Sequence, residues 1–600
     1  MIKVLKRMRR TDWFFVLICA VLICGQVNLD LKLPDYMQNI TQKVQSGASV
    51  HDVLVIGGKM LLCTLGSLCL TFIVGFFAAR VAAGLSMRLR GLVFEKTLSF
   101  SMEEINKFSI ASLITRSTND ITQIQLVVAF GLQAAVRAPV MAVWAIVKVS
   151  TKHWQFAIVT GVAVAFIVCV LIAVQLLAVP RFRRIQTLTD NLNRVTNENL
   201  RGLRVVRAYN AENYQGKKFE TANSDLTNNN LFANRVMAIM GAGMNLITNG
   251  MPLGIYWIGT ALINKAPVPD AAAMAAMVTT GAQPDRYLIF SEMVTFMSYS
   301  MQIVMSFMML AMIFVFMPRV TVAAKRIAQV LDTKVRIADG AGAQPREDLR
   351  GEVEFKNVSF RYPDGGEDVL QNVSFTAKPG ETVAFIGSTG SGKSTLVNLI
   401  PRFYDPSEGD VFLDGVNVRD YKQRDLRNRL GYVSQQAILF YGTIESNVAF
   451  GENGRPKPGL DAVKRAVRIA QAQEFVDELE DGYDAHVSQG GSNFSGGQKQ
   501  RISIARAVCR DPEVYIFDDS FSALDYKTDR SLRSVLERET GSATKLIVAQ
   551  RIGTIRDADK IIVLDEGRVV GVGKHRELLE TCAVYKEIAL SQLSKEELDA

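Results

Sequence analysis

The stretch VAFIGSTGSGKSTLVNLI, residues 383–400, decides the fold of the second half of the chain. Its apolar start is typical of a buried strand and its end has the pattern of a helix, with a glycine-rich loop between them. The loop fits the pattern GxxxxGKS, whose fixed positions are Gly387, Gly392, Lys393 and Ser394. Because a strand precedes this loop and a helix follows it, the stretch predicts an α/β domain that binds a nucleotide.

The residues of this phosphate loop (387–395) match the needs of the phosphates of ATP or GTP. Glycines let backbone amides turn toward phosphate oxygens, Lys393 adds a positive charge, and Ser394 offers a hydroxyl to Mg²⁺. The predicted cofactors are therefore the nucleotide and Mg²⁺. The residues expected around the phosphates are Gly387, Ser388, Thr389, Gly390, Ser391, Gly392, Lys393, Ser394 and Thr395.

Length and composition limit the number of domains and the class of protein. Its 600 residues are too many for one core, so we expect at least two domains. The apolar fraction is 48%, and the excess lies in the first half. The net charge of +9 admits nucleic acid or anionic lipid as a partner, but basic residues in a membrane protein mostly report topology. The seven cysteines show no metal-ligand spacing and are interpreted as buried apolar residues in a reducing compartment.

Six apolar segments are long enough to cross a membrane. Since a helix rises about 1.5 Å per residue, a hydrocarbon core of about 30 Å takes roughly 20 residues. We interpret the first segment as a span rather than a signal peptide, because no small-residue cleavage site follows it. Its outer end carries Asp30, which must leave the lipid or face protein. The segments run approximately over 13–34, 53–82, 122–148, 153–178, 237–263 and 287–317.

Lys and Arg are concentrated in the N-terminus and in the stretches 83–121 and 179–236. By the positive-inside rule, both termini and these two long loops are cytoplasmic. The loops have helical periodicity, so we expect the spans to continue into the cytoplasm as long helices. The domains are predicted as a membrane domain over 1–317, a polar linker over 318–350 and a nucleotide-binding domain over 351–600.

Further motifs follow the phosphate loop. They are YVSQQ with Gln435, SNFSGGQKQR over 492–501, VYIFDD ending in Asp518 and Asp519, SALD ending in Asp525, and LIVAQR with Gln550. With these motifs in this order, essentially the whole chain resembles an exporter-type ABC transporter: a helical membrane domain of six spans fused to an α/β phosphate-loop nucleotide-binding domain. The resemblance implies an ATPase that couples hydrolysis to transport.

The resemblance implies a role for each motif. Tyr362 stands where the family stacks an aromatic ring on adenine, with a core strand aromatic as the alternative. Gln435 resembles the residue that contacts Mg²⁺ and the attacking water. The implied metal ligands are Ser394, Gln435 and Asp518.

A second group of residues resembles those that act across a dimer. Asp525 resembles the residue that communicates between subunits. The signature (residues 495–498) resembles a helix start that presents its amides to the γ-phosphate of ATP held by another subunit. Its residues are Ser495, Gly496, Gly497 and Gln498.

Two positions depart from the family pattern. Where the family has a glutamate that polarises the water, this chain has Asp519, and where it has a histidine, this chain has Gln550. Shortening a base by one methylene withdraws its carboxylate by more than about 1 Å, which can cost roughly a hundredfold in rate. Glutamine cannot carry a positive charge to a developing phosphate charge. The catalytic positions Asp519, Gln550 and Gln435 therefore predict a site that binds ATP but hydrolyses it poorly.

The combination of an intact signature and a degenerate site in one chain favours a heterodimer. The chain resembles the degenerate half of bacterial multidrug exporters, whose partner hydrolyses ATP against this chain's signature. This implies a multi-pass protein of the bacterial plasma membrane that exports hydrophobic or amphiphilic, drug-like compounds. The alternatives are a dedicated peptide or lipid exporter and a nucleotide-gated regulatory subunit. The six spans exclude a soluble nucleic-acid ATPase.

Contacts with the membrane domain and the substrate are less defined. We expect coupling loops to dock near residues 109–113 and 210–214, although Gln489 replaces a glutamate that many relatives carry in the opposing segment. Spans five and six are rich in methionine, which suits either an adaptable substrate surface or ordinary packing. Arg137 and Glu292 are expected either to face the cavity or to pair between helices or at the interface.

Overall fold

The computed structural model describes residues 2–150, 154–268, 285–363 and 365–593. The chain divides into two compact units, and each consists of two segments of the chain. The first unit is Met1–Thr97 with Ala111–Thr333, and the second is Leu98–Ile110 with Lys334–Ala600.

The first unit is made of long helices. Six stretches of the described residues are long and apolar enough to cross a membrane, which confirms the predicted number of spans. Residue 153, where one predicted span begins, lies outside the described residues. The helices are α1 (Ile2–Leu5), α2 (Arg10–Gln45), α3 (Val50–Leu98), α5 (Ile110–Ser117), α6 (Asn119–Ser150), α7 (Trp154–Arg201), α8 (Leu203–Ala208), α9 (Glu212–Lys265) and α11 (Asp285–Asp332).

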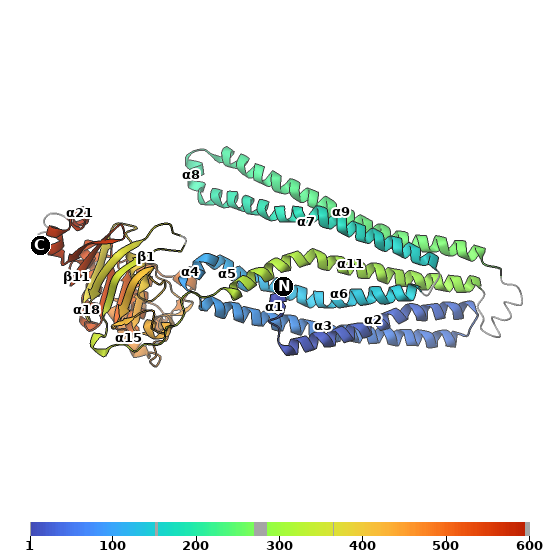
Figure 1. The fold of residues 1–600 in the computed structure, drawn as a ribbon, viewed down its shortest axis with the longest axis horizontal. Coiled ribbons are helices and arrows are strands. Elements are labelled where there is room, and N and C mark those ends of the chain that lie inside the picture. The colour runs from blue at the N-terminus through green and yellow to red at the C-terminus, as the bar shows by residue number, and fades with distance from the viewer. Residues whose placement is uncertain (1, 151–153, 269–284, 364, 594–600) are drawn as a thin grey trace. The chain divides into compact units, whose positions relative to one another are not determined.

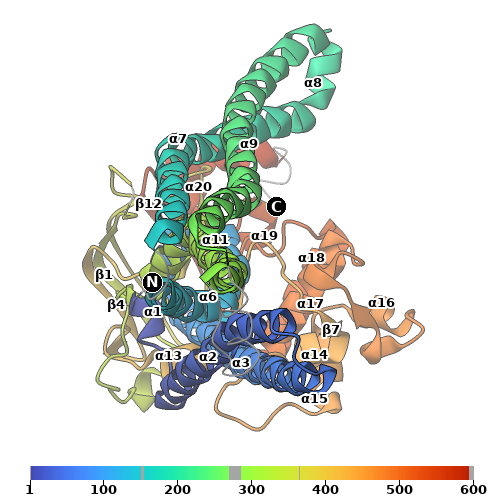
Figure 2. The same ribbon diagram turned by 90° about the vertical axis from the view of Figure 1, so that its right-hand side faces the viewer.

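Several of these helices are much longer than a membrane requires. Helices α3 and α7 have 49 and 48 residues, more than twice the roughly 20 that a bilayer needs. Helices α7 and α9 pack along each other and are joined by α8 into a hairpin. Figure 1 and Figure 2 show that the α8 end of this hairpin stands apart from α2 and α3. The basic loops are therefore helical, as expected.

Charged residues within the spans are paired between helices. Arg137 of α6 lies 3.0 Å from Asp30 of α2, whose other carboxylate oxygen accepts a hydrogen bond from Ser67 of α3. Lys148 of α6 lies 2.8 Å from Asp35 of α2. Asp30 thus faces protein, as its place in an apolar segment requires. For Arg137 the structure shows the helix-pairing alternative.

The second unit contains two main sheets. The first has the order β2-β1-β4-β5 and is antiparallel. The second has the order β12-β11-β3-β10-β9-β6, in which only β12 is antiparallel to its neighbour. The strands are β1 (Val353–Phe360), β2 (Leu370–Ala377), β3 (Thr382–Gly387), β4 (Glu408–Leu413), β5 (Val416–Asn417), β6 (Leu430–Val433), β7 (Gly442–Thr443), β8 (His486–Val487), β9 (Val514–Asp518), β10 (Thr544–Val548), β11 (Lys560–Asp565) and β12 (Arg568–Gly573).

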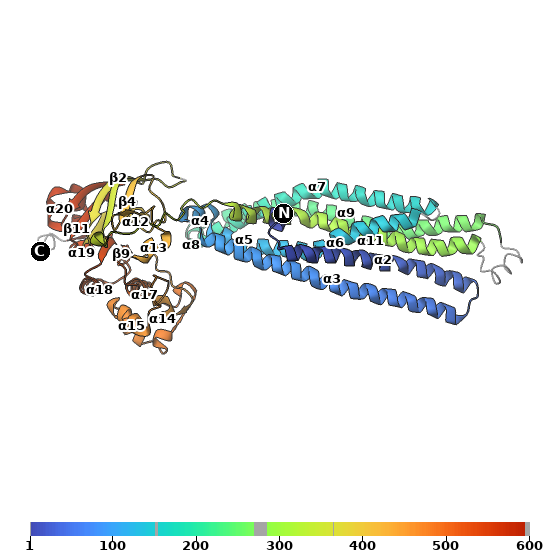
Figure 3. The same ribbon diagram turned by 60° about the horizontal axis from the view of Figure 1, so that its bottom comes forward.

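Helices surround the parallel sheet, and Figure 3 shows α14, α15 and α17 grouped beside it. Strands β9 and β10 are buried along their whole length, as expected for central strands with both faces covered. The helices are α4 (Met102–Phe108), α12 (Lys393–Leu399), α13 (Gln423–Asn428), α14 (Ile444–Val448), α15 (Leu460–Ile469), α16 (Gln473–Asp477), α17 (Gly496–Cys509), α18 (Tyr526–Glu539), α19 (Ile552–Ile555), α20 (His575–Thr581) and α21 (Ala583–Gln592), with 3₁₀ turns η1 (Glu347–Leu349), η2 (Gly482–Asp484) and η3 (Gln489–Gly491).

The unit boundaries differ from the predicted domains. Helix α11 continues to Asp332, so the segment expected as a linker over 318–350 begins as helix. Its polar sequence still has buried Val320 and Ile327 at helical spacing, and these residues keep the helix packed. The short segment around α4 belongs to the nucleotide unit although it lies between two spans in the sequence.

Candidate nucleotide site

The phosphate loop joins the middle of the parallel sheet to α12. Gly390 and Gly392 have φ of +88° and +93°, a region that favours glycine. A Cβ on Gly392 would lie 2.7 Å from a methyl of Leu370 and 2.9 Å from the carbonyl oxygen of Val369. Any other residue at position 392 would therefore be strained and would clash with Val369 and Leu370.

The lysine of the loop is held by the loop itself. Lys393 Nζ donates to the carbonyl oxygens of Gly387 at 2.8 Å and Ser388 at 2.7 Å, and to Ser391 Oγ at 3.3 Å. Burial lowers the pKa of the Lys393 ammonium, against the opposing effect of the Asp519 carboxylate. The charge lies at the start of α12, where the helix dipole adds to it.

The end of β9 places an acidic side chain beside the loop. Asp518 is 5% exposed, and its Oδ1 accepts a hydrogen bond of 2.7 Å from Ser394 Oγ. Burial raises the pKa of the Asp518 carboxyl, and the bond from Ser394 opposes this shift. A hydroxyl and a carboxylate in contact form the oxygen donor pair that suits Mg²⁺.

The next residue, Asp519, contacts both glutamines that sequence motifs single out. Its Oδ2 accepts from Gln550 Nε2 at 2.8 Å and from Gln435 Nε2 at 3.3 Å. Burial raises the pKa of the Asp519 carboxyl, and hydrogen bonds from Gln435 and Ser522 oppose this shift. The two departures from the family pattern are thus bonded to each other.

Strand register explains why these residues meet. Val548 of β10 pairs with Asp518 of β9 on one side and with Phe385 of β3 on the other. The carboxyl ends of parallel strands lie at one edge of the sheet, where such folds bind ligands. The phosphate loop and the segments after β6, β9 and β10 therefore share the phosphate edge (Lys393, Ser394, Gln435, Asp518, Asp519 and Gln550).

Tyr362 is half-buried in an aromatic cluster next to the loop. Its ring meets Tyr404 edge-on at 5.3 Å between centroids and Phe360 at 4.9 Å. Its hydroxyl lies 3.0 Å from Thr395 Oγ1. The ring packs just beyond the end of β1 and its hydroxyl contacts the last residue of the phosphate loop, while stacking on adenine stays a prediction.

Sequence reasoning missed a contact on α4. Asn106 Nδ2 donates to the Tyr404 hydroxyl at 3.0 Å, which links α4 to the aromatic cluster. The expected contact near residues 109–113 follows this helix, which ends where Ser109 adopts a φ of +58°. The capping-box sequence SMEE, in which the Glu104 side chain accepts from the Ser101 amide, marks the helix start and could have indicated it.

The other motifs lie on the surface. Ser495 caps α17 and forms a capping box with Gln498, while Asp525 caps α18 by accepting from the Thr528 amide at 2.9 Å. Ser495 and Asp525 are exposed, as is Gln489 in η3. Among the described residues, no hydrogen bond or ion pair joins the signature to the phosphate loop. The second coupling stretch, 210–214, lies in the first unit, and its docking stays a prediction.

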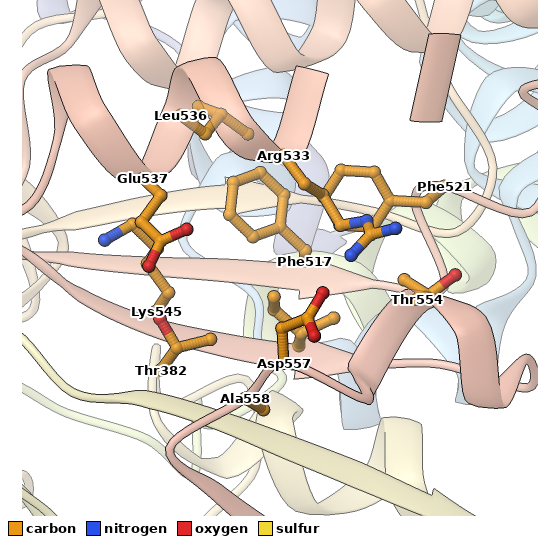
Figure 4. Close-up of a pocket in the computed structure, with 11 residues that line it drawn as sticks. Thr382, Phe517, Phe521, Arg533, Leu536, Glu537, Lys545, Thr554, Asp557 and Ala558 are labelled. Carbon is orange, nitrogen blue, oxygen red and sulfur yellow. The ribbon is translucent and has the colours of Figure 1, made fainter. Parts of the chain in front are cut away.

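A cavity lies behind the phosphate edge, between α18, β10 and α19. Figure 4 shows Arg533, Phe521 and Thr554 toward one end of the cavity and Glu537 and Lys545 toward the other, with Phe517 between them. It has a volume of about 60 Å³, and no residue of the phosphate loop or signature lines it. It is therefore separate from the nucleotide site.

Six apolar helices and a phosphate-loop domain define a membrane-bound ATPase of half-transporter architecture. Family models match both parts: "ABC transporter transmembrane region" over residues 14–283 and "ABC transporter" over residues 370–522.

Known proteins resemble the chain over nearly its full length. An uncharacterized ABC transporter ATP-binding protein of Mycobacterium tuberculosis (strain ATCC 25618 / H37Rv) is 37% identical over 90% of this chain and 88% of its own. One from Bacillus subtilis (strain 168) is 34% identical over 96% of each chain. An ATP-dependent lipid A-core flippase of Pseudomonas aeruginosa is 31% identical over 86% of this chain and 82% of its own.

A solved structure shares the fold. The structure of a bacterial Atm1-family ABC exporter with ATP bound superposes with a TM-score of 0.74, covering 98% of this chain and 99% of the other at 23% identity. The chain belongs to the ABC transporter family. It is a multi-pass membrane protein whose ABC ATPase domain binds ATP and couples its hydrolysis to transport, and such half-transporters are generally dimeric.

Proposed function

We propose that this chain is the degenerate half of a heterodimeric exporter: its own site holds ATP as a clamp, and its signature completes the catalytic site of a partner. The bond between Gln550 and Asp519 carries this proposal. An intact phosphate loop for binding is thereby combined with a base, Asp519, that already accepts hydrogen bonds from Gln435 and Gln550.

The hydrogen-bond capacity of Asp519 supports slow hydrolysis. A carboxylate oxygen has two lone pairs, and Oδ2 already accepts two amide donors, from Gln435 and Gln550. Neither amide can take a proton from water, and neither carries a positive charge. A general base must reach the water that it deprotonates. The Asp519 side chain is shorter than a glutamate and already accepts hydrogen bonds from Gln435 and Gln550.

The binding of ATP and Mg²⁺ fits the residues present. Lys393 would exchange its bonds with loop carbonyls for phosphate oxygens, and the amides after Gly390 and Gly392 would face the phosphates. Ser394 and Asp518 would hold Mg²⁺, which neutralises phosphate charge when bound, and Gln435 offers an amide oxygen on the same side. Adenine would lie near Tyr362.

The surface supports a second subunit. The signature begins a helix of 14 residues at the surface, and its exposed capping residue can present N-terminal amides to an anion. The tip around α8 also carries apolar side chains that are exposed. They are Leu200, Leu203, Val205, Tyr209 and Tyr214. Such a tip suits docking on a partner's nucleotide domain. The partner would supply the glutamate and histidine that this chain lacks.

The substrate proposed is a hydrophobic or amphiphilic, drug-like compound that leaves the cytoplasm or inner leaflet of the bacterial plasma membrane, with both termini cytoplasmic. A lipid is the second candidate, because a lipid A-core flippase is 31% identical to this chain. A panel of dyes and drugs that raises ATPase activity in the assembled transporter supports the first, and stimulation by lipids alone supports the second.

The test of the degenerate site is the steady-state ATPase activity of this chain alone in nanodiscs. It is compared with the same chain carrying Asp519→Glu and Gln550→His. We expect the native chain to be nearly inactive and the double variant to gain turnover by roughly a hundredfold, the size of the predicted defect. Ordinary exporter turnover by the native chain as a homodimer would show that Asp519 is a sufficient base.

A further inference from the structure

The last described helix of the chain ends against the segment that carries Gln550. Gln592 at the end of α21 uses one side-chain amide for two bonds: Nε2 donates to the carbonyl oxygen of Gln550 at 2.8 Å, and Oε1 accepts from the Ile552 amide at 2.8 Å. Because one planar group holds both a donor and an acceptor of the main chain, it fixes the orientation of this turn.

Helix α21 is itself anchored in the core. Tyr585 and Ala589 are fully buried, and the Tyr585 hydroxyl lies 2.7 Å from His575 Nδ1 of α20. Gln592 therefore extends from a fixed helix, although its own side chain is exposed. A contact from a fixed element restrains a loop at a smaller entropic cost than a contact from a mobile tail.

A second element holds the same segment. Thr554 Oγ1 donates to Asp529 Oδ2 at 3.3 Å, and Arg533 of α18 donates to the Gly553 carbonyl oxygen at 3.1 Å. Figure 4 shows Arg533 and Thr554 lying close together at the cavity behind the sheet. The switch segment (residues 550–554) is thus held by α18 and by α21, and the bonds from α21 lie nearest to Gln550.

We propose that Gln592 is a positioning residue for position 550, so that helix α21 determines where the Gln550 side chain lies at the ATP site of this chain. The main chain at 550 determines where the side-chain amide meets Asp519 Oδ2, and a shift of about 1 Å at a catalytic group is enough to change a rate strongly. The inference rests on the proposed role of Gln550 at the ATP site. Since both of these hydrogen bonds of Gln592 go to main-chain groups, its effect is expected to persist with histidine at position 550.

The test introduces Gln592→Leu into the full chain in nanodiscs, in both the native and the Asp519→Glu, Gln550→His background. In whichever background turns over, we expect kcat to fall about threefold to tenfold with KM for ATP changed by less than about twofold. The matched control is Glu587→Leu, an exposed residue of the same helix, which leaves both constants unchanged. An unchanged kcat, or an equal loss with Glu587→Leu, overturns the proposal.

Hydrogen exchange over residues 549–556, with and without ATP and Mg²⁺, gives a readout that needs no turnover. Gln592→Leu is expected to reduce the protection that ATP induces there, and Glu587→Leu to preserve it. Unaltered protection in both variants overturns the proposal even in an inactive chain. The degenerate-site proposal fails separately, through equal turnover of the two parent backgrounds, while each Gln592→Leu variant is compared only with its own parent.

Discussion

At the phosphate edge, Lys393, Ser394 and Asp519 form hydrogen bonds within their own domain. At a second surface, called here the signature edge (the signature, residues 495–498, with Asp525), Ser495 and Asp525 are exposed and cap helices α17 and α18. The first edge is preorganised within one chain, because β3, β9 and β10 end together there. The second has no described partner in the phosphate loop of its own chain. The difference shows that this chain builds one edge from its own contacts and leaves the other outward-facing, and the two departures nearest the expected water, Asp519 and Gln550, lie at the first.

The largest effect is expected from the loop lysine. Lys393→Met removes the positive charge expected at the phosphates, so ATP affinity should fall roughly 10- to 100-fold, as for the loss of a charge-assisted bond. Binding of labelled ATP to the full chain in nanodiscs measures it. Lys527→Met, an exposed lysine beside Asp525, is the control. An equal loss of ATP affinity in both variants would contradict the claim that the phosphate edge, and not the signature edge, holds ATP in this chain.

Acidic pH should separate the two edges next. Burial raises the pKa of Asp518 and of Asp519, while the Thr528 amide lowers the pKa of Asp525. A raised pKa means that protonation begins at a higher pH than for an ordinary carboxyl, so Mg²⁺-dependent ATP affinity should decline as the solution is acidified. The lowered pKa of Asp525 means that its helix cap should persist to a lower pH. A flat affinity profile, measured by titration at each pH, would contradict this assignment.

The α4 contact should affect stability more than ATP binding. Asn106→Ala removes the hydrogen bond to the Tyr404 hydroxyl, and we expect a loss of about 1 kcal/mol from the nucleotide domain, with ATP affinity changed by less than about twofold. Calorimetry of the thermal unfolding of the full chain measures this loss of stability. Tyr404→Phe removes the same bond from the other side, so different effects of the two variants would argue against a shared contact.

The smallest effect is expected at the helix cap of the signature edge. Asp525→Ala removes the acceptor for the Thr528 amide and should lower the Tm by roughly 2 °C, whereas Asp525→Asn keeps an acceptor and should nearly preserve it. Calorimetry distinguishes the two variants. If Asp525→Asn is as harmful as Asp525→Ala, the charge rather than the cap is what matters at this position.

Local pattern was enough to predict the phosphate loop and the acidic end of β9, because each motif is a strand followed by a turn with strict residue requirements. It was also enough for six spans, since apolar length is a local property. The bond between Gln550 and Asp519 was beyond it: that contact depends on the register of β9 and β10, which brings together residues from distant parts of the chain.

Two further features needed tertiary structure. The extension of α11 to Asp332 depends on packing of residues such as Ile327, which outweighs a polar composition that resembles a linker. The contact of Asn106 with Tyr404 joins two residues that are 298 positions apart in the sequence. Local signals exist for both helices, in the capping box at Ser101 and in the helical spacing of Val320 and Ile327, but the residues that these helices contact cannot be read from the neighbouring sequence.

The most direct test of the central claim is the identity of the nucleotide that this chain retains. The native chain in nanodiscs is loaded with labelled ATP and Mg²⁺, quenched at successive times, and its bound nucleotide is separated into ATP and ADP. We predict that native protein keeps ATP while Asp519→Glu with Gln550→His converts it to ADP within the same interval. Conversion by the native chain at the rate of the double variant would contradict the account of a site locked by Asp519 and Gln550.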